Sequence, residues 1–307
     1  MADITASRIN NLQSSIALVL GTGSGQTGYG QTVTSVPVNN TGDIVEAADI
    51  NAIYADILKA RVHQAGAGDI GIAEVIQNLN IVAEDTSNFI SDAGVTTADP
   101  DGFKKGIEDF ESLMLTVIAN KAIIDATQAD LEPGITSVRS STWNGLIYHE
   151  IQVTFSSVDA KRFFFNAGGE IRLSANNTSA STPKGLDWNQ LCSQVGTIKF
   201  SAENTVSTSG GGSSIGNYDL TGSFQNIYQK IGSGTYSAIY AGNIYTVKAR
   251  SDIDTRIIFR IEFNDIVFDN NVDNNVDGRL ESVIQHYRAN GEVVTLAPSY
   301  FNSNELA

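Results

Sequence analysis

Cysteine, histidine and long hydrophobic runs are scarce in this chain of 307 residues. The single cysteine, Cys192, excludes an intrachain disulfide bond, and we expect it to be a small buried side chain. The three histidines are scattered, and none stands at metal-ligand spacing from another: His63, His149 and His286. No run approaches the about 18 apolar residues of a membrane-spanning helix, and the N-terminus, MADITASRIN, has no signal-peptide pattern. We therefore expect no membrane insertion, and synthesis in a cytosol without export.

Positive charge is scarce as well. Lys and Arg total 19 against 34 Asp and Glu, which gives a formal net charge of −15, and the acidic excess lies mainly in residues 1–135. No basic cluster offers the surface that releases counterions from a nucleic acid, and an acidic surface repels phosphate and anionic lipid. We therefore expect no direct nucleic-acid partner.

The first half of the chain has the apolar period of helices. Apolar residues recur at helical spacing near the N-terminus, and a second stripe follows Asp43 and Glu46, which have the spacing of a capping box. We predict helices over four ranges: 3–20, 43–58, 70–84 and 104–130. The last should stop before Pro133-Gly134, because proline cannot continue a helix and glycine opens a turn.

After Pro133 the apolar period changes to two, as it does in β-strands. Alternation of apolar and polar residues is clear in three ranges: 151–155, 245–250 and 256–263. Residues 162–173 read as a hairpin whose turn contains Gly168 and Gly169. Many short strands joined by polar loops predict an antiparallel sandwich.

Together these patterns predict an α+β, multidomain chain. Residues 1–134 form an N-terminal helical oligomerisation or attachment domain, and residues 135–307 form an antiparallel β-sandwich domain. Leu115 and Ile123 lie outside the main apolar stripe of the predicted 104–130 helix, which indicates a second surface to cover. We expect a homo-oligomer with trimeric symmetry. The alternative is that both side chains pack inside a monomeric helical bundle.

An Asn/Asp-rich loop carries the best chemical signal. Asp273, Asn275 and Asp277 stand at alternate positions before a glycine, as in loops that wrap a hard cation. Glu281 takes the ninth position, but Ile284 takes the twelfth, where an EF-hand needs a bidentate acid. The sequence therefore predicts a shortened calcium loop, and the alternative is a solvated turn between strands.

Other candidate chemistry is weaker. Four tyrosines are able to stack on sugar rings or to fill a core or an interface: Tyr236, Tyr240, Tyr245 and Tyr300. The string from Gly23 to Gly28 matches a dinucleotide fingerprint, and that from Gly212 to Gly216 matches a nucleophile elbow. Neither has the strand and helix that its mechanism requires. We expect no enzymatic activity.

Several long strings carry a resemblance to a known family. They include SRINNL at 7–12, DIVEAADINAIYADILKARVHQAG at 43–66, WNGLIYHEIQVTF at 143–155 and VDGRLESVIQHYRANG at 276–291. They resemble virion structural proteins of tailed bacteriophages, of the type found with marine and cyanobacterial hosts and associated with the neck, collar or tail fibres. The resemblance covers nearly the whole chain.

This resemblance implies a structural component of a tailed-phage virion that is assembled in the host cytoplasm. Its partners would be copies of itself and other virion proteins. The resemblance implies no catalytic residues, and no cofactor is expected apart from the calcium considered above. The alternative is an adhesin whose sandwich binds a host-surface glycan.

Overall fold

The computed structural model describes residues 6–21, 28–38, 45, 47–65, 102–124, 126–267, 275–289 and 296–306. The chain divides into two compact units. The helical unit comprises Met1–Ala129 with Ala289–Thr295, and the sandwich unit comprises Asp130–Arg288 with Leu296–Ala307. No helix in the described part of the chain combines the length and the hydropathy of a membrane-spanning segment.

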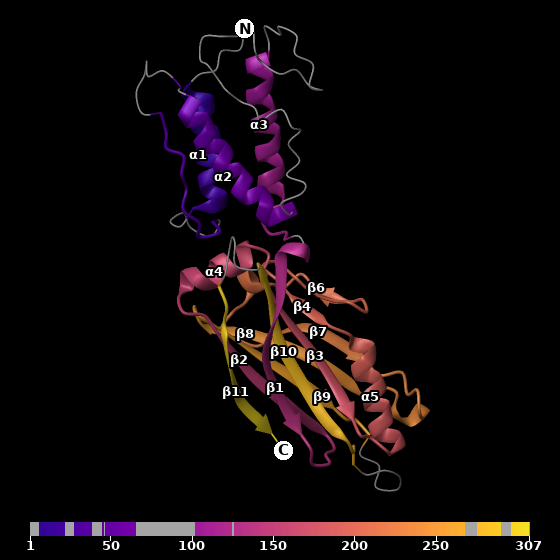
Figure 1. Cartoon of the computed structure of the whole chain (residues 1–307). Helices are drawn as coiled ribbons and strands as arrows, with labels where there is room; N and C mark the ends of the chain where they lie inside the picture. Colours follow the sequence, from indigo (N-terminus) through magenta and orange to yellow (C-terminus); the bar gives the residue numbers. More distant parts are fainter. Residues whose placement is uncertain are drawn as a thin grey trace. The chain divides into compact units, whose positions relative to one another are not determined.

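Long helices make up the described part of the helical unit: α1 (Ala6–Leu20), α2 (Ala47–Ala65) and α3 (Gly102–Ala119). Each of them packs against the other two (Figure 1). Helices α1 and α2 confirm two of the predicted helices. The predicted helix near 70–84 and the capping pair Asp43 and Glu46 lie outside the described residues.

The long helix predicted to precede Pro133 was wrong at its C-terminal end. Helix α3 stops at Ala119, and residues Ala129–Arg139 form strand β1. Pro133 is tolerated inside β1 because this strand lies at the edge of its sheet and needs hydrogen bonds on one side only. Gly134 lets β1 approach its neighbour, since a Cβ here would lie 2.1 Å from the carbonyl oxygen of Ile284. The Pro-Gly pair therefore marks a close strand contact.

Two antiparallel sheets form the sandwich unit, which confirms the predicted α+β fold with a β-sandwich. After β1, the strands are β2 (Leu146–Thr154), β3 (Glu170–Thr178), β4 (Ile198–Phe200), β5 (Thr205–Ser207), β6 (Gly212–Ser213), β7 (Gln225–Ile231), β8 (Ile244–Ile253), β9 (Arg256–Asn264), β10 (Arg279–Ala289) and β11 (Ser299–Leu306). Among the described residues, the order is β1-β10-β3-β4-β5-β6 in one sheet and β11-β2-β9-β8-β7 in the other (Figure 1). Strands β2, β8 and β9 confirm the three predicted ranges.

The hairpin predicted over 162–173 was wrong. Residues Val158–Asn166 form helix α4, whose N-cap is Ser157. Phe164 and Phe165 are each 1% exposed, and their ring centroids lie 5.0 Å apart. Consecutive side chains of a strand point to opposite faces, so a helix is the better way to bury both rings in one core.

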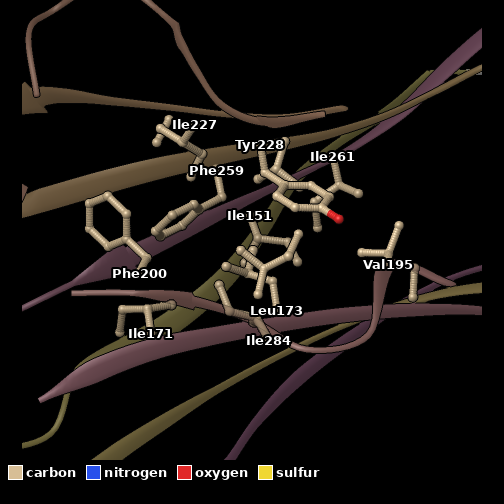
Figure 2. Packing of buried hydrophobic residues seen from close by; sticks show 14 of the residues in the cluster. Ile151, Ile171, Leu173, Val195, Phe200, Ile227, Tyr228, Phe259, Ile261 and Ile284 are labelled. Atoms are coloured by element: carbon tan, nitrogen blue, oxygen red, sulfur yellow. The ribbon is translucent and has the colours of Figure 1, made fainter. Parts of the chain in front are cut away.

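The apolar core of the sandwich unit lies between its two sheets. Figure 2 shows side chains that meet there from the five-stranded and the six-stranded sheet: Ile151, Phe259 and Ile261 from the former, Ile171, Leu173 and Ile284 from the latter. Helix α5 (Pro183–Val195) packs against β3 and adds Trp188 and Cys192 to the core. Cys192 is 1% exposed, which confirms its predicted burial.

Candidate functional site

The described part of the predicted calcium loop lies against the start of α5. The Asp277 carboxylate accepts the backbone N–H of Ser181 at 2.8 Å and the hydroxyls of Ser181 and Thr182 at 2.7 and 2.6 Å. Thr182, the N-cap of α5, in turn accepts the N–H of Gly185. Partial burial opposes ionisation of Asp277, but these hydrogen bonds outweigh it and lower the pKa. Asp277 therefore holds the N-terminus of α5 in place.

The other predicted ligands have different surroundings. Asp273 lies outside the described residues, and Asn275 is exposed. Glu281 lies on β10 and forms an ion pair with Arg279. In the part of the chain that the structure describes, no group of three or more His, Cys, Asp or Glu side chains could hold a metal ion. The calcium site stays a prediction, while Asp277 is observed to hold Ser181 and the N-cap residue Thr182 by hydrogen bonds.

The four tyrosines considered for sugar stacking do not form one platform. Tyr240 and Tyr245 are 1% and 0% exposed, so their rings are closed to a ligand. The hydroxyl of Tyr300 lies 2.7 Å from Nδ1 of His286, and the two rings stack. Of the four, Tyr236 alone is half exposed.

A set of polar pairs, which we call the inter-sheet seam, links the two sheets. The pairs are His149 with Ser282 (2.8 Å), His286 with Tyr300 (2.7 Å) and Ser137 with Asn302 (2.6 Å). Each pair joins a residue of β1 or β10 to a residue of β2 or β11. No sequence pattern predicts the seam, because the partners of two pairs are more than a hundred residues apart.

The seam holds two histidines in their neutral form. Burial lowers the pKa of His149 to about 4, and the nearby charge of Arg139 adds to the shift. Burial also lowers the pKa of His286, with Arg288 acting in the same direction and Glu132 against it. His149 and Ser282 have the separation of a base and a nucleophile, but they are 1% and 0% exposed. Their surroundings favour a structural role.

Helix α3 leaves apolar side chains exposed, on a surface that we call the α3 strip and define as Leu115 and Ile118. These residues are 70% and 44% exposed, and their spacing of three places them on one face of the helix. Met114 and Val117, on the adjacent face of the helix, are 3% and 0% exposed. Ile123, expected on the same helix, follows its end and is 54% exposed.

A second exposed apolar surface crosses one end of the five-stranded sheet. Leu146 of β2 and Ile244 of β8 both pair with Asn264 of β9, and Ile231 of β7 pairs with Ile244. Residues paired in this way share a face of the sheet. Leu146 and Ile231 are 55% and 58% exposed. We call Leu146, Ile244 and Ile231 the apolar row.

Comparisons with known proteins add no relative from which a role could be transferred. No protein-family model, no curated protein and no solved structure matches the chain. The seam, the α3 strip and the apolar row are therefore the basis on which a function is proposed.

Proposed function

We propose that this chain is a structural component of a tailed-phage virion, of the neck, collar or tail-fibre type, and that it acts through protein–protein assembly. The α3 strip is the observation that carries the proposal. Helix α3 already buries Met114 and Val117 within the chain, yet it presents Leu115 at 70% exposure. Leaving large aliphatic side chains in water forgoes about 1.5–3 kcal/mol each, which burial in an assembly recovers.

The helical unit is the part that associates with further copies of the chain in this proposal. Its acidic character opposes nonspecific aggregation, so association depends on a defined apolar contact. The expected assembly is a homo-oligomer with trimeric symmetry. The apolar row gives the sandwich unit a separate surface for neighbouring virion proteins. Assembly takes place in the host cytoplasm, and the virion is the final location.

The composition of purified particles tests the virion role. We would purify tailed-phage particles from a lysate of the host that carries this gene and quantify the chain by mass spectrometry against the other particle proteins. The expected result is a fixed copy number per particle that survives a second density gradient. Recovery of the chain only in the soluble fraction of the lysate would contradict the proposal.

A host-surface glycan-binding adhesin is the second proposed function. Tyr236 favours it, because this ring is 50% exposed on a loop where Ile239 is also exposed. A glycan array probed with the full-length chain and with Tyr236→Ala tests the adhesin proposal. Glycan binding by the wild-type chain that is lost in Tyr236→Ala supports the adhesin proposal. If the wild-type chain binds no glycan, the adhesin proposal is wrong and the assembly proposal is unaffected.

A further inference from the structure

The sandwich unit contains a lysine and an aspartate that meet out of contact with water. Lys184 of α5 is 1% exposed and Asp265, the residue after β9, is 0% exposed. Nζ of Lys184 lies 2.6 Å from Oδ2 of Asp265. Although this contact is short, Oδ2 has no partner in hydrogen-bond geometry. The amine is therefore at ion-pair distance from the carboxyl group, while Oδ2 lies outside hydrogen-bond geometry.

Backbone groups hold both side chains in this position. The carbonyl oxygen of Val267 accepts a hydrogen bond from Lys184 Nζ at 2.8 Å, which fixes the amine. The N–H of Val267 donates to Oδ1 of Asp265, and the N–H of Asp265 donates to the carbonyl of Gly145. The two reacting groups are thus immobilised before any reaction, which is the condition under which intramolecular reactions reach high effective molarity.

Aromatic residues close to the pair in sequence form an apolar cluster. Trp188 follows Lys184 by one turn of α5, and Phe263 precedes Asp265 by two residues. The centroids of their rings lie 5.9 Å apart, and Trp143 lies 5.0 Å from Trp188. All three rings belong to the buried core. Such surroundings provide little solvation for charge.

Two charges buried in such a place are costly, and a proton transfer removes both of them. Burial raises the pKa of Asp265, although Lys184 and the backbone N–H groups oppose the rise. Isolated ions in an apolar interior lose most of their solvation, and a carboxylate and an ammonium group that exchange one proton avoid this loss. A neutral amine facing a neutral carboxylic acid is the pair of groups from which an amide forms.

We propose that Lys184 and Asp265 are the site of an intramolecular amide, or isopeptide, bond. The lone pair of Nζ attacks Cγ of the protonated carboxyl group, so a C–N bond forms and the C–OH bond breaks. One N–H proton goes to the leaving hydroxyl, and one water molecule departs. The reaction needs no oxidant, reductant or further reactant.

The bond would join α5 covalently to the segment that follows β9. These two places are far apart in the sequence, so the cross-link closes a long loop of chain. A covalent cross-link of this kind lowers the conformational entropy of the unfolded chain and so stabilises the fold, as a disulfide bond does. This protein has a single cysteine, which excludes an intrachain disulfide bond. The cross-link would also keep α5 attached to the sandwich unit under mechanical load.

The intact mass of the purified full-length chain tests the proposal. The expected mass is that of the sequence less one water molecule, and a protease digest should give a branched peptide that contains both Lys184 and Asp265. Lys184→Met and Asp265→Ala should each show their full calculated mass. Lys248→Met is the matched control, because Lys248 makes an ion pair with Glu262 at a more exposed position. Its mass should still be one water molecule below the calculated mass of the variant.

The wild-type measurement decides the matter whether or not the variants fold. A folded wild-type chain with the full calculated mass, whose digest gives Lys184 and Asp265 on separate linear peptides, would overturn the proposal and leave a buried ion pair. Loss of water that persists in Lys184→Met would equally overturn it, because the modification would then lie elsewhere.

Discussion

The two units of the chain differ in how they treat their apolar side chains. The sandwich unit gathers its large apolar residues into one buried cluster that both sheets and helices α4 and α5 supply. The helical unit buries one side of α3 and leaves the α3 strip exposed. The sandwich unit also exposes apolar side chains, in the apolar row, but its buried cluster gives it a large core of its own. The α3 strip is the surface through which we propose that copies of the chain associate. Stability and assembly are therefore expected to depend on different units.

The largest effect should come from a cavity in the sandwich core. Phe259 is fully buried, and its ring lies 5.2 Å from that of Phe200. Phe259→Ala should lower the free energy of unfolding by about 3–5 kcal/mol, because the transfer energy is lost and a cavity remains. Denaturant unfolding measures this. Phe301→Ala is the matched control, since Phe301 is 63% exposed and its loss should change stability by about 0.5 kcal/mol or less. Equal losses in the two variants would refute the distinction between core and surface.

Acid should weaken the sandwich unit through the inter-sheet seam. The pKa of His149 falls from 6.5 to about 4 on burial, so the unfolded chain takes up a proton before the folded chain does. Stability is therefore complete above about pH 6.5 and declines as the pH falls toward 4, by about 3 kcal/mol from this group. Unfolding midpoints measured across this range should show the decline.

The double variant His149→Leu with Ser282→Ala tests the origin of that slope. Replacing both partners by apolar groups removes the donor and the acceptor of this pair together, so we expect a small change in stability at pH 7 and a shallower decline toward pH 4. His286 still titrates in this variant, because burial lowers its pKa too. A slope identical to that of the wild type would show that His149 is not the group responsible.

A smaller loss of stability is expected when the hydrogen bonds of Asp277 at the start of α5 are removed. Asp277→Ala removes the acceptor of the Ser181 and Thr182 hydrogen bonds and should lower stability by about 1–2 kcal/mol. If the predicted calcium loop binds the ion, calcium should also raise the melting temperature of the wild-type chain, and Asp277→Ala should abolish the rise. A melting temperature that neither calcium nor EDTA changes would leave Asp277 only as the hydrogen-bond acceptor of Ser181 and Thr182.

Local periodicity made the fold class predictable, but it failed where packing decided the structure. Alternation identified β8 and β9, because each of these strands has one buried face. The run Phe163-Phe164-Phe165 was predicted as a hairpin strand because Gly168 and Gly169 follow it, and only the position of the core shows that a helix buries Phe164 and Phe165. Pro133-Gly134 was interpreted as a helix stop, although it serves the contact of β1 with β10.

The candidate sites were harder to predict than the fold. Asp277 was predicted as a calcium ligand, and its observed partners, Ser181 and Thr182, were not predicted because they are almost a hundred residues away. His149 with Ser282, and Lys184 with Asp265, are likewise brought together only by the tertiary fold. Leu115 is the exception, because its position outside the main apolar stripe of a helix was visible in the sequence.

Light scattering of the purified full-length chain at micromolar concentration tests the assembly claim most directly. Because the monomer mass is 32.7 kDa, we expect a mass three times as large for the wild type. Leu115→Glu with Ile118→Glu should return a monomer that keeps the far-UV circular dichroism spectrum of the wild type, whereas Thr116→Glu, at an exposed position of the same helix, should remain trimeric. A strictly monomeric wild-type chain would contradict self-assembly through the α3 strip.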